Sequence, residues 1–211
     1  MTTIKLIILT LAFIVGLFQS CHQSSDSSSK VSKEEMGSLK QPAYGKAPEY
    51  RSATKYGEAG KAPGMKVKLL STVGDVKTYA IIFSKGDEAV SGLTEFAQNY
   101  KVKSGHYQAV GDALHVEAGW FDYQRKEFLV ISLDSVEVTS FTGDIAWYNK
   151  KPVAHTHMSA SMKDGSVKGG HLLALIVGPT LEVIVTVEPT QLYKRLNEEF
   201  KAGLIDPDIT E

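Results

Sequence analysis

The chain has 211 residues, 43% of them hydrophobic, which is enough for one well-buried core but short for two. Its 23 Lys and Arg residues and 24 Asp and Glu residues nearly cancel, so no excess of positive charge is available to neutralise nucleic-acid phosphates. A single cysteine excludes an internal disulfide.

The first segment is typical of a secretory leader. A positive charge at Lys5 precedes a nearly unbroken apolar run over residues 6–18, and the run ends shortly before Cys21. Such a run is shorter than the about 20 helical residues that cross a hydrocarbon core. We therefore expect a signal peptide at residues 1–20 rather than a membrane span.

The position of Cys21 resembles the lipobox of bacterial lipoproteins, with small Ser20 before it and Leu17 four residues upstream. The resemblance implies a diacylglycerol on the thiol, and acyl chains contribute about 0.8 kcal/mol per buried methylene to membrane attachment. We therefore expect an exported protein of the cell envelope, anchored to the membrane by its lipid and facing the periplasm or the cell surface. The alternative is an ordinary cleaved leader in which Cys21 is incidental.

Residues 21–64 are expected to form a tether followed by an arm. Residues 22–33 offer almost no apolar surface to bury, which predicts a flexible spacer. Residues 41–64 are rich in Gly, Pro, Ala and Tyr, and this composition indicates an extended arm that packs its tyrosines on the domain surface.

A folded domain is expected at residues 65–207, where short β-type runs alternate with turns. Apolar residues recur at helical spacing over residues 89–100, and residues 72–75 suit a hairpin turn. A second, shorter helix is expected at residues 191–201. We therefore predict an α+β fold with a mostly antiparallel sheet and one principal helix. The later strands are expected at 106–110, 113–121, 127–133, 135–147, 153–161, 171–177 and 180–187.

Three of the six histidines predict a metal site. His155 and His157 alternate along one expected strand, so their side chains project to the same face. The turn-like residues 163–166 would return the chain as a hairpin, and the two glycines before His171 would permit close backbone approach. Three neutral imidazoles suit Zn²⁺ or another divalent metal and leave a fourth position for water or substrate. The alternative is three hydrogen-bonded histidines on half-buried strands.

Other polar residues of the domain carry weaker signals. His106 and His115 lie on earlier expected strands and have no comparable partner in sequence. Glu182 is a carboxylate within an apolar strand, and it is a candidate catalytic group for proton transfer or for support of the metal ligands. Its alternative is the solvent side of an edge strand. The sequence contains no phosphate-binding glycine loop and no nucleophile elbow.

These motifs resemble the plants-and-prokaryotes-conserved (PPC) domain family over about residues 76–206. The most specific stretch runs from the His-Thr-His of residues 155–157 to the Gly-Gly-His of residues 169–171. The resemblance implies an α+β fold that assembles as a homotrimer, in a family whose prokaryotic members mostly lack an assigned activity. Supporting segments are 79–88, 120–122 and 137–143.

The same histidine arrangement is similar to that of acetolactate decarboxylases, in which three histidines hold zinc. This resemblance supports zinc at His155, His157 and His171, but it does not carry the reaction over, because a fold does not determine a function. Plant PPC proteins bind DNA through a separate Arg-Gly-Arg-Pro type AT-hook, and this sequence contains no such motif.

The sequence therefore predicts an exported, lipid-anchored PPC-domain protein of unassigned activity that binds a divalent metal and acts on a small molecule. The alternative is a trimeric binding or assembly module in which any metal is structural. The leader and the near-neutral charge argue against a DNA-binding regulator, so we expect no nucleic-acid partner. Whether the protein is an enzyme stays open at this point.

Overall fold

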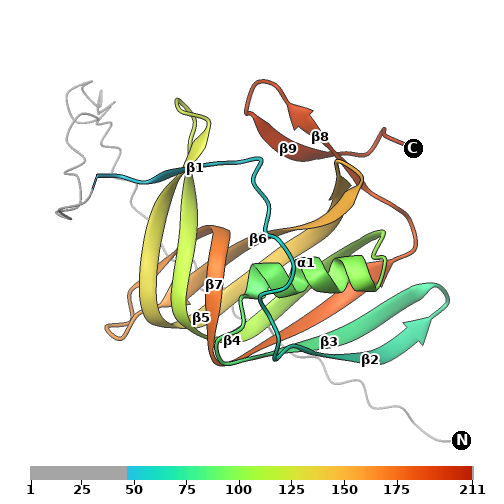
Figure 1. Cartoon of the computed structure of the whole chain (residues 1–211), viewed down its shortest axis with the longest axis horizontal. Helices are drawn as coiled ribbons and strands as arrows, with labels where there is room; N and C mark the ends of the chain where they lie inside the picture. Colours follow the sequence, from blue (N-terminus) through green and yellow to red (C-terminus); the bar gives the residue numbers. More distant parts are fainter. Residues whose placement is uncertain (1–46, 211) are drawn as a thin grey trace, which may run out of the picture. The chain divides into compact units, whose positions relative to one another are not determined.

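The computed structural model of the chain describes residues 47–210, and these residues form a curled β-sheet with one helix against it (Figure 1). The elements in chain order are β1 (Tyr50–Ser52), β2 (Lys66–Val73), β3 (Val76–Ser84), α1 (Ala89–Asn99), β4 (Ser104–Asp122), β5 (Glu127–Tyr148), β6 (Lys151–Ser161), β7 (Val167–Glu188), β8 (Tyr193–Asn197) and β9 (Ala202–Asp206).

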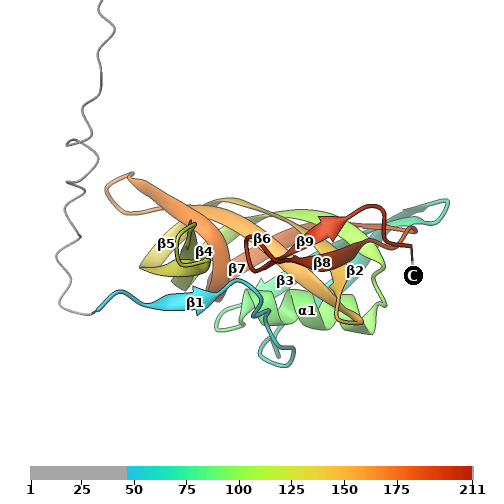
Figure 2. The same ribbon diagram turned by 90° about the horizontal axis from the view of Figure 1, so that it is seen from above.

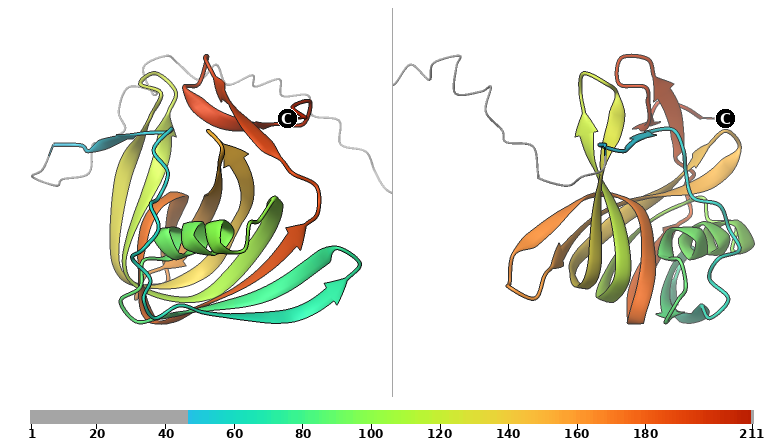
Figure 3. Two further views of the ribbon diagram at one scale, coloured as in Figure 1. Left: turned by 45° about the vertical axis from the view of Figure 1, so that its right-hand side comes forward. Right: turned by 60° about the vertical axis from the view of Figure 1, so that its left-hand side comes forward.

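The sheet closes on itself in its central part. Strand β7 pairs with β4, β4 with β5, β5 with β6, and β6 returns to pair with β7. Strands β2 and β3 extend the sheet beyond β7, and all of these pairings are antiparallel. One parallel contact, between Trp147 and Tyr193, joins β5 to β8 and makes the sheet mixed. This circuit of pairings explains the strong curl in Figure 3.

The core lies between the sheet and α1, which packs on β6 and β7 (Figure 2). The helix forms because apolar residues recur every three or four positions, and Leu93 and Phe96 are fully buried. Glu88 caps its N-terminus by accepting hydrogen bonds from the backbone N–H groups of Val90 and Ser91. Such a cap stabilises a helix by about 1 kcal/mol. The face of the sheet opposite the helix is here called the outer face, and it carries exposed side chains such as Gln108, Glu182 and Ile184.

The N-terminal arm and the C-terminal hairpin meet at one end of the sheet. Strand β1 adds to the edge of β5, pairing Tyr50 with Leu129. The ring of Tyr56 lies 5.5 Å from that of Tyr148, and its hydroxyl donates a hydrogen bond to the carbonyl of Gly203 in β9. The arm is therefore part of the described domain surface.

Two predictions about the fold are wrong. The domain is not an α+β fold, because α1 is its one described helix and most of the described chain is strand, in a β-rich mixed sheet. The helix expected at residues 191–201 is instead the hairpin of β8 and β9. Backbone pairing between two segments outweighs the helical spacing of a few apolar residues there, because intrinsic helix propensity is a weak preference.

The other expected elements are confirmed with longer strands. The helix at residues 89–99 and the hairpin turn between Val73 and Val76 are present. The separate strands expected on either side of residue 134 form the single strand β5, in which Ser135 adopts a left-handed φ of 52°. Strands β4 and β7 likewise continue through register shifts.

The signal peptide at residues 1–20, Cys21 and the spacer after it lie outside the described residues. Within residues 47–210, no helix is long and apolar enough to cross a membrane.

Candidate metal centre

The three predicted histidines lie side by side on the outer face of β6 and β7. His155 and His157 alternate along β6, where the residues between and after them, Thr156 and Met158, are buried toward the core. The register of the hairpin pairs His157 directly with His171. Gly169 permits this pairing, because a Cβ there would lie 2.1 Å from the carbonyl oxygen of Met158.

The three imidazoles form a compact cluster. One ring nitrogen of each histidine lies within 4.8 Å of the corresponding nitrogens of the other two. The ring centroid of His155 lies 5.1 Å from the centroids of His157 and His171, and the centroids of His157 and His171 are 5.4 Å apart. Three nitrogens at this spacing could hold one metal ion.

His171 forms the buried side of the cluster. Its ring stacks on that of Phe128, with 4.3 Å between the ring centroids and 5° between the ring planes. Burial, followed by the charges of His155 and His157, lowers the pKa of His171 to about 3. Its Nδ1 is buried and has no hydrogen-bond partner among the described residues. A neutral imidazole with an unsatisfied buried nitrogen fits a metal site, because a metal ligand must present an unprotonated nitrogen.

His157 forms the open side. Its side chain is exposed, while that of His155 is 36% exposed. The part of the ring that is buried and the charge of His155 lower the pKa of His157, which also favours the neutral ligand form. The exposure on this side would leave a coordination position open to water or a small molecule, as in catalytic zinc sites.

Asp144 of β5 supports the cluster from behind. It lies opposite His155 in the sheet, and its Oδ2 is 3.0 Å from His155 Nδ1. Its Oδ1 lies 3.0 Å from Lys194 Nζ of β8, whose side chain is 2% exposed. Burial alone would raise the pKa of Asp144, but the hydrogen bond from His155 and the charge of Lys194 outweigh it and lower the pKa. Asp144 is therefore an ionised carboxylate that orients the ring of His155, one of the three candidate metal ligands.

Comparison with known families identifies the domain. The model of the Plants and Prokaryotes Conserved (PCC) domain matches residues 70–188, which is more than half of the chain. The chain belongs to the PCC domain family. The resemblance to this family that the sequence predicted is thus confirmed, and the match includes β4 to β7 with all three histidines.

Solved PCC-like structures share the fold. A proposed DNA-binding protein from Ralstonia eutropha JMP134 is 29% identical, with a TM-score of 0.60, covering 66% of this chain and 95% of that one. A plant- and prokaryote-conserved (PPC) protein from Pyrococcus horikoshii is 21% identical, with a TM-score of 0.58, covering 68% and 97%. A metal-containing protein from Archaeoglobus fulgidus is 22% identical, with a TM-score of 0.57, covering 67% and 96%. No curated protein matches the chain in sequence. Acetolactate decarboxylase is not one of these three, and the resemblance to it stays a prediction.

The other candidate residues of this PCC domain lie apart from the cluster. Glu182 is exposed on β7 and lines a shallow depression with Gln108 and Ile184. Strand β6 pairs with β7 only at residues 167–171, and the neighbours of Glu182 in the sheet are Ile82 of β3 and Val110 of β4. His115 pairs instead with Asp134, at 2.6 Å. His106 lies opposite Asp144 in the sheet, but its side chain is exposed.

The prediction from sequence missed Asp144, Lys194 and Phe128. Asp144 lies only eleven residues before His155, so a hairpin register centred on the turn after Tyr148 would have paired them. No comparable signal exists for Lys194, because it reaches the site from a segment that was expected to be a helix. Phe128 of β5 reaches His171 of β7 across Gly119 of β4, which pairs with His171 and has no side chain in the way.

Proposed function

We propose that this PCC-domain protein binds a divalent metal, zinc, through His155, His157 and His171, and uses the open side of the site to bind a small molecule. The observation that carries the proposal is the mutual approach of three imidazole nitrogens within 4.8 Å, from two strands held in register. Three protein nitrogens with one side open are typical of zinc sites that contact substrate.

The chemistry of the surrounding residues supports this proposal. Burial of His171 favours its neutral form, and the hydrogen bond from His155 to Asp144 fixes the orientation of the His155 ring. A bound zinc ion would supply a Lewis acid for a carbonyl or phosphoryl oxygen or lower the pKa of a water molecule. The metal-containing protein from Archaeoglobus fulgidus, which shares the fold, is consistent with metal binding in this family.

Metal analysis tests the proposal. The chain carrying Cys21→Ser, purified without a histidine tag, should retain about one zinc per chain after dialysis at neutral pH. His157→Ala should retain almost none, because two imidazoles do not complete the ligand set. Equal metal contents in the two proteins would contradict the assignment, as would no zinc in the wild type after loading.

We further propose export and lipid attachment at Cys21, on the sequence alone. Labelled fatty acid should enter the wild-type protein and not Cys21→Ser, because the thiol is the attachment point. Equal labelling of both would contradict the proposal.

A second candidate function is a homotrimeric binding or assembly module with a structural metal or none. The exposed apolar side chains of β2, Leu69, Leu70 and Val73, favour association, since natural proteins tend to cover exposed strand edges. Light scattering at micromolar concentration should report a trimer, and a monomer would contradict this. DNA binding is not proposed, because the net charge of −1 offers no excess of cations for phosphates.

A further inference from the structure

We propose that Lys194, on the C-terminal hairpin, is a positioning residue of the metal site that acts through Asp144 on His155. The inference rests on the proposed metal binding, but it concerns a residue that lies outside the family match at residues 70–188. The hairpin of β8 and β9 would then be part of the site in this chain.

The burial of Lys194 requires an explanation. Its side chain is 2% exposed, and lysines are almost never this buried unless they are paired. An ammonium that leaves water costs free energy, which an opposite charge offsets only at close range. The partner is Asp144, whose Oδ1 lies 3.0 Å from Nζ as an ion pair without the alignment of a hydrogen bond.

The two oxygens of Asp144 have different partners. Oδ1 faces Lys194, and Oδ2 faces Nδ1 of His155 at 3.0 Å. An ionised carboxylate only accepts hydrogen bonds, so Nδ1 of His155 carries the proton. The lone pair of a neutral His155 is then on Nε2, the nitrogen left available to a metal. By holding Oδ1, Lys194 keeps Oδ2 turned toward His155.

The backbone fixes Lys194 in this place. The N–H of Trp147 donates a 2.8 Å hydrogen bond to the carbonyl of Leu192, and Trp147 pairs with Tyr193 just before the lysine. Strand β9 then holds β8 from its other side, pairing Ile205 with Lys194. The backbone of Lys194 is therefore held by hydrogen-bonded pairing with strands on both sides of β8.

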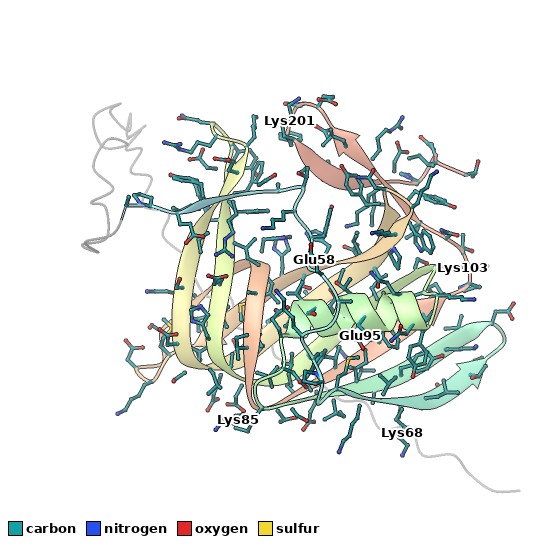
Figure 4. All side chains as sticks on the ribbon, viewed as in Figure 1. Glu58, Lys68, Lys85, Glu95, Lys103 and Lys201 are labelled. Carbon is teal, nitrogen blue, oxygen red and sulfur yellow. The ribbon has the colours of Figure 1, made fainter. Side chains whose placement is uncertain are left out.

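Lys201 provides a matched control on the same hairpin. It lies in the turn between β8 and β9, where Figure 4 labels it, and its side chain is 58% exposed. Its partner is Glu198, three residues before it, and not a residue of the histidine cluster. Lys201→Met makes the same substitution as Lys194→Met and removes the same positive charge from the hairpin, but it leaves the partners of Asp144 unchanged.

The sign of the effect on zinc affinity separates positioning from simple electrostatics. If Lys194 acted only as a nearby positive charge, its removal would strengthen the binding of a cation. If it positions His155 through Asp144, Lys194→Met should weaken zinc binding about tenfold, the scale of lost support behind a metal ligand. Lys194→Arg keeps the charge and should recover most of the affinity.

The test combines zinc titration with histidine NMR on the full chain carrying Cys21→Ser. Zinc affinity is measured by competition with a chromophoric chelator, and the tautomer of His155 by long-range ¹H–¹⁵N correlation in the metal-free protein at pH 7.5. We expect the Nδ1–H tautomer in the wild type and in Lys201→Met, and a mixture in Lys194→Met. Unchanged or tighter zinc binding by folded Lys194→Met, or an unchanged tautomer, would overturn the proposal.

Two further outcomes keep the test decisive. If Lys194→Met does not fold, an Nε2–H form of His155 in the wild type would still refute the positioning role. If the wild type binds no zinc, the proposed function fails, while a tautomer change between wild type and Lys194→Met would still establish the link from Lys194 to His155.

Discussion

Strand β7 carries two of the residues that the sequence predicted to take part in chemistry, and their surroundings in the structure differ. His171 lies near the start of the strand, stacked on Phe128 and paired with His157. Glu182 lies eleven residues later, exposed on the outer face opposite Ile82. A polar residue in an apolar strand is thus a functional candidate only when neighbouring strands bring it compatible partners.

The strongest test of this contrast is metal loss. His157→Ala should weaken zinc binding at least 100-fold, because it removes one of three ligands, whereas Glu182→Ala should change it less than twofold. Competition with a chromophoric chelator at pH 7.5 measures both affinities. Equal losses in the two variants would remove the distinction between the histidine cluster and Glu182.

Thermal stability should follow the same division. A metal that binds only the folded state, at a free concentration 100 times its Kd, adds about 2.7 kcal/mol to the free energy of unfolding. This corresponds to a rise of roughly 5–10 °C in Tm for a domain of this size. Chelator should therefore lower the Tm of the wild type and of Glu182→Ala, and leave His157→Ala almost unchanged. Calorimetry in the presence and absence of zinc measures the shift, and a chelator response in His157→Ala would place the metal elsewhere.

Acid should reveal the burial of His171 without any metal. Because its pKa falls to about 3 in the folded domain, below its ordinary value of 6.5, it stabilises the fold above pH 6.5. This contribution is lost as pH falls from 6.5 toward 3, and we expect a loss of roughly 3 kcal/mol by pH 4. Urea unfolding of metal-free protein should show a shallower pH slope in His171→Phe than in Glu182→Ala. Equal slopes would show that His171 is not buried in its neutral form.

The smallest expected effect is that of His106→Ala. His106 lies opposite Asp144 in the sheet but is exposed, so its removal should leave zinc affinity within twofold and stability within about 0.5 kcal/mol. A larger loss in the same chelator competition would add His106 to the site.

Local patterns predicted the parts of the molecule that local physics determines. Helical spacing located α1, and strand alternation with a short turn brought His155, His157 and His171 together. These features depend on residues close in sequence, where side-chain direction follows directly from backbone geometry.

The rest depends on contacts between distant segments. Strand β5 continues through Ser135 only because this residue adopts a left-handed conformation. From the sequence pattern, a break between two strands was expected at this position. Apolar residues at helical spacing over residues 191–201 favour a helix, but antiparallel pairing between β8 and β9 forms there instead. Lys194 meets Asp144 only after both the curl of the sheet and this hairpin are in place.

Zinc-edge X-ray absorption of the zinc-loaded chain carrying Cys21→Ser tests the central claim most directly. The account predicts three imidazole nitrogens at about 2.0–2.1 Å and one oxygen from water, with the imidazole scattering reduced in His157→Ala. A shell of oxygen ligands alone, or an identical spectrum from His157→Ala, would contradict a zinc site at His155, His157 and His171.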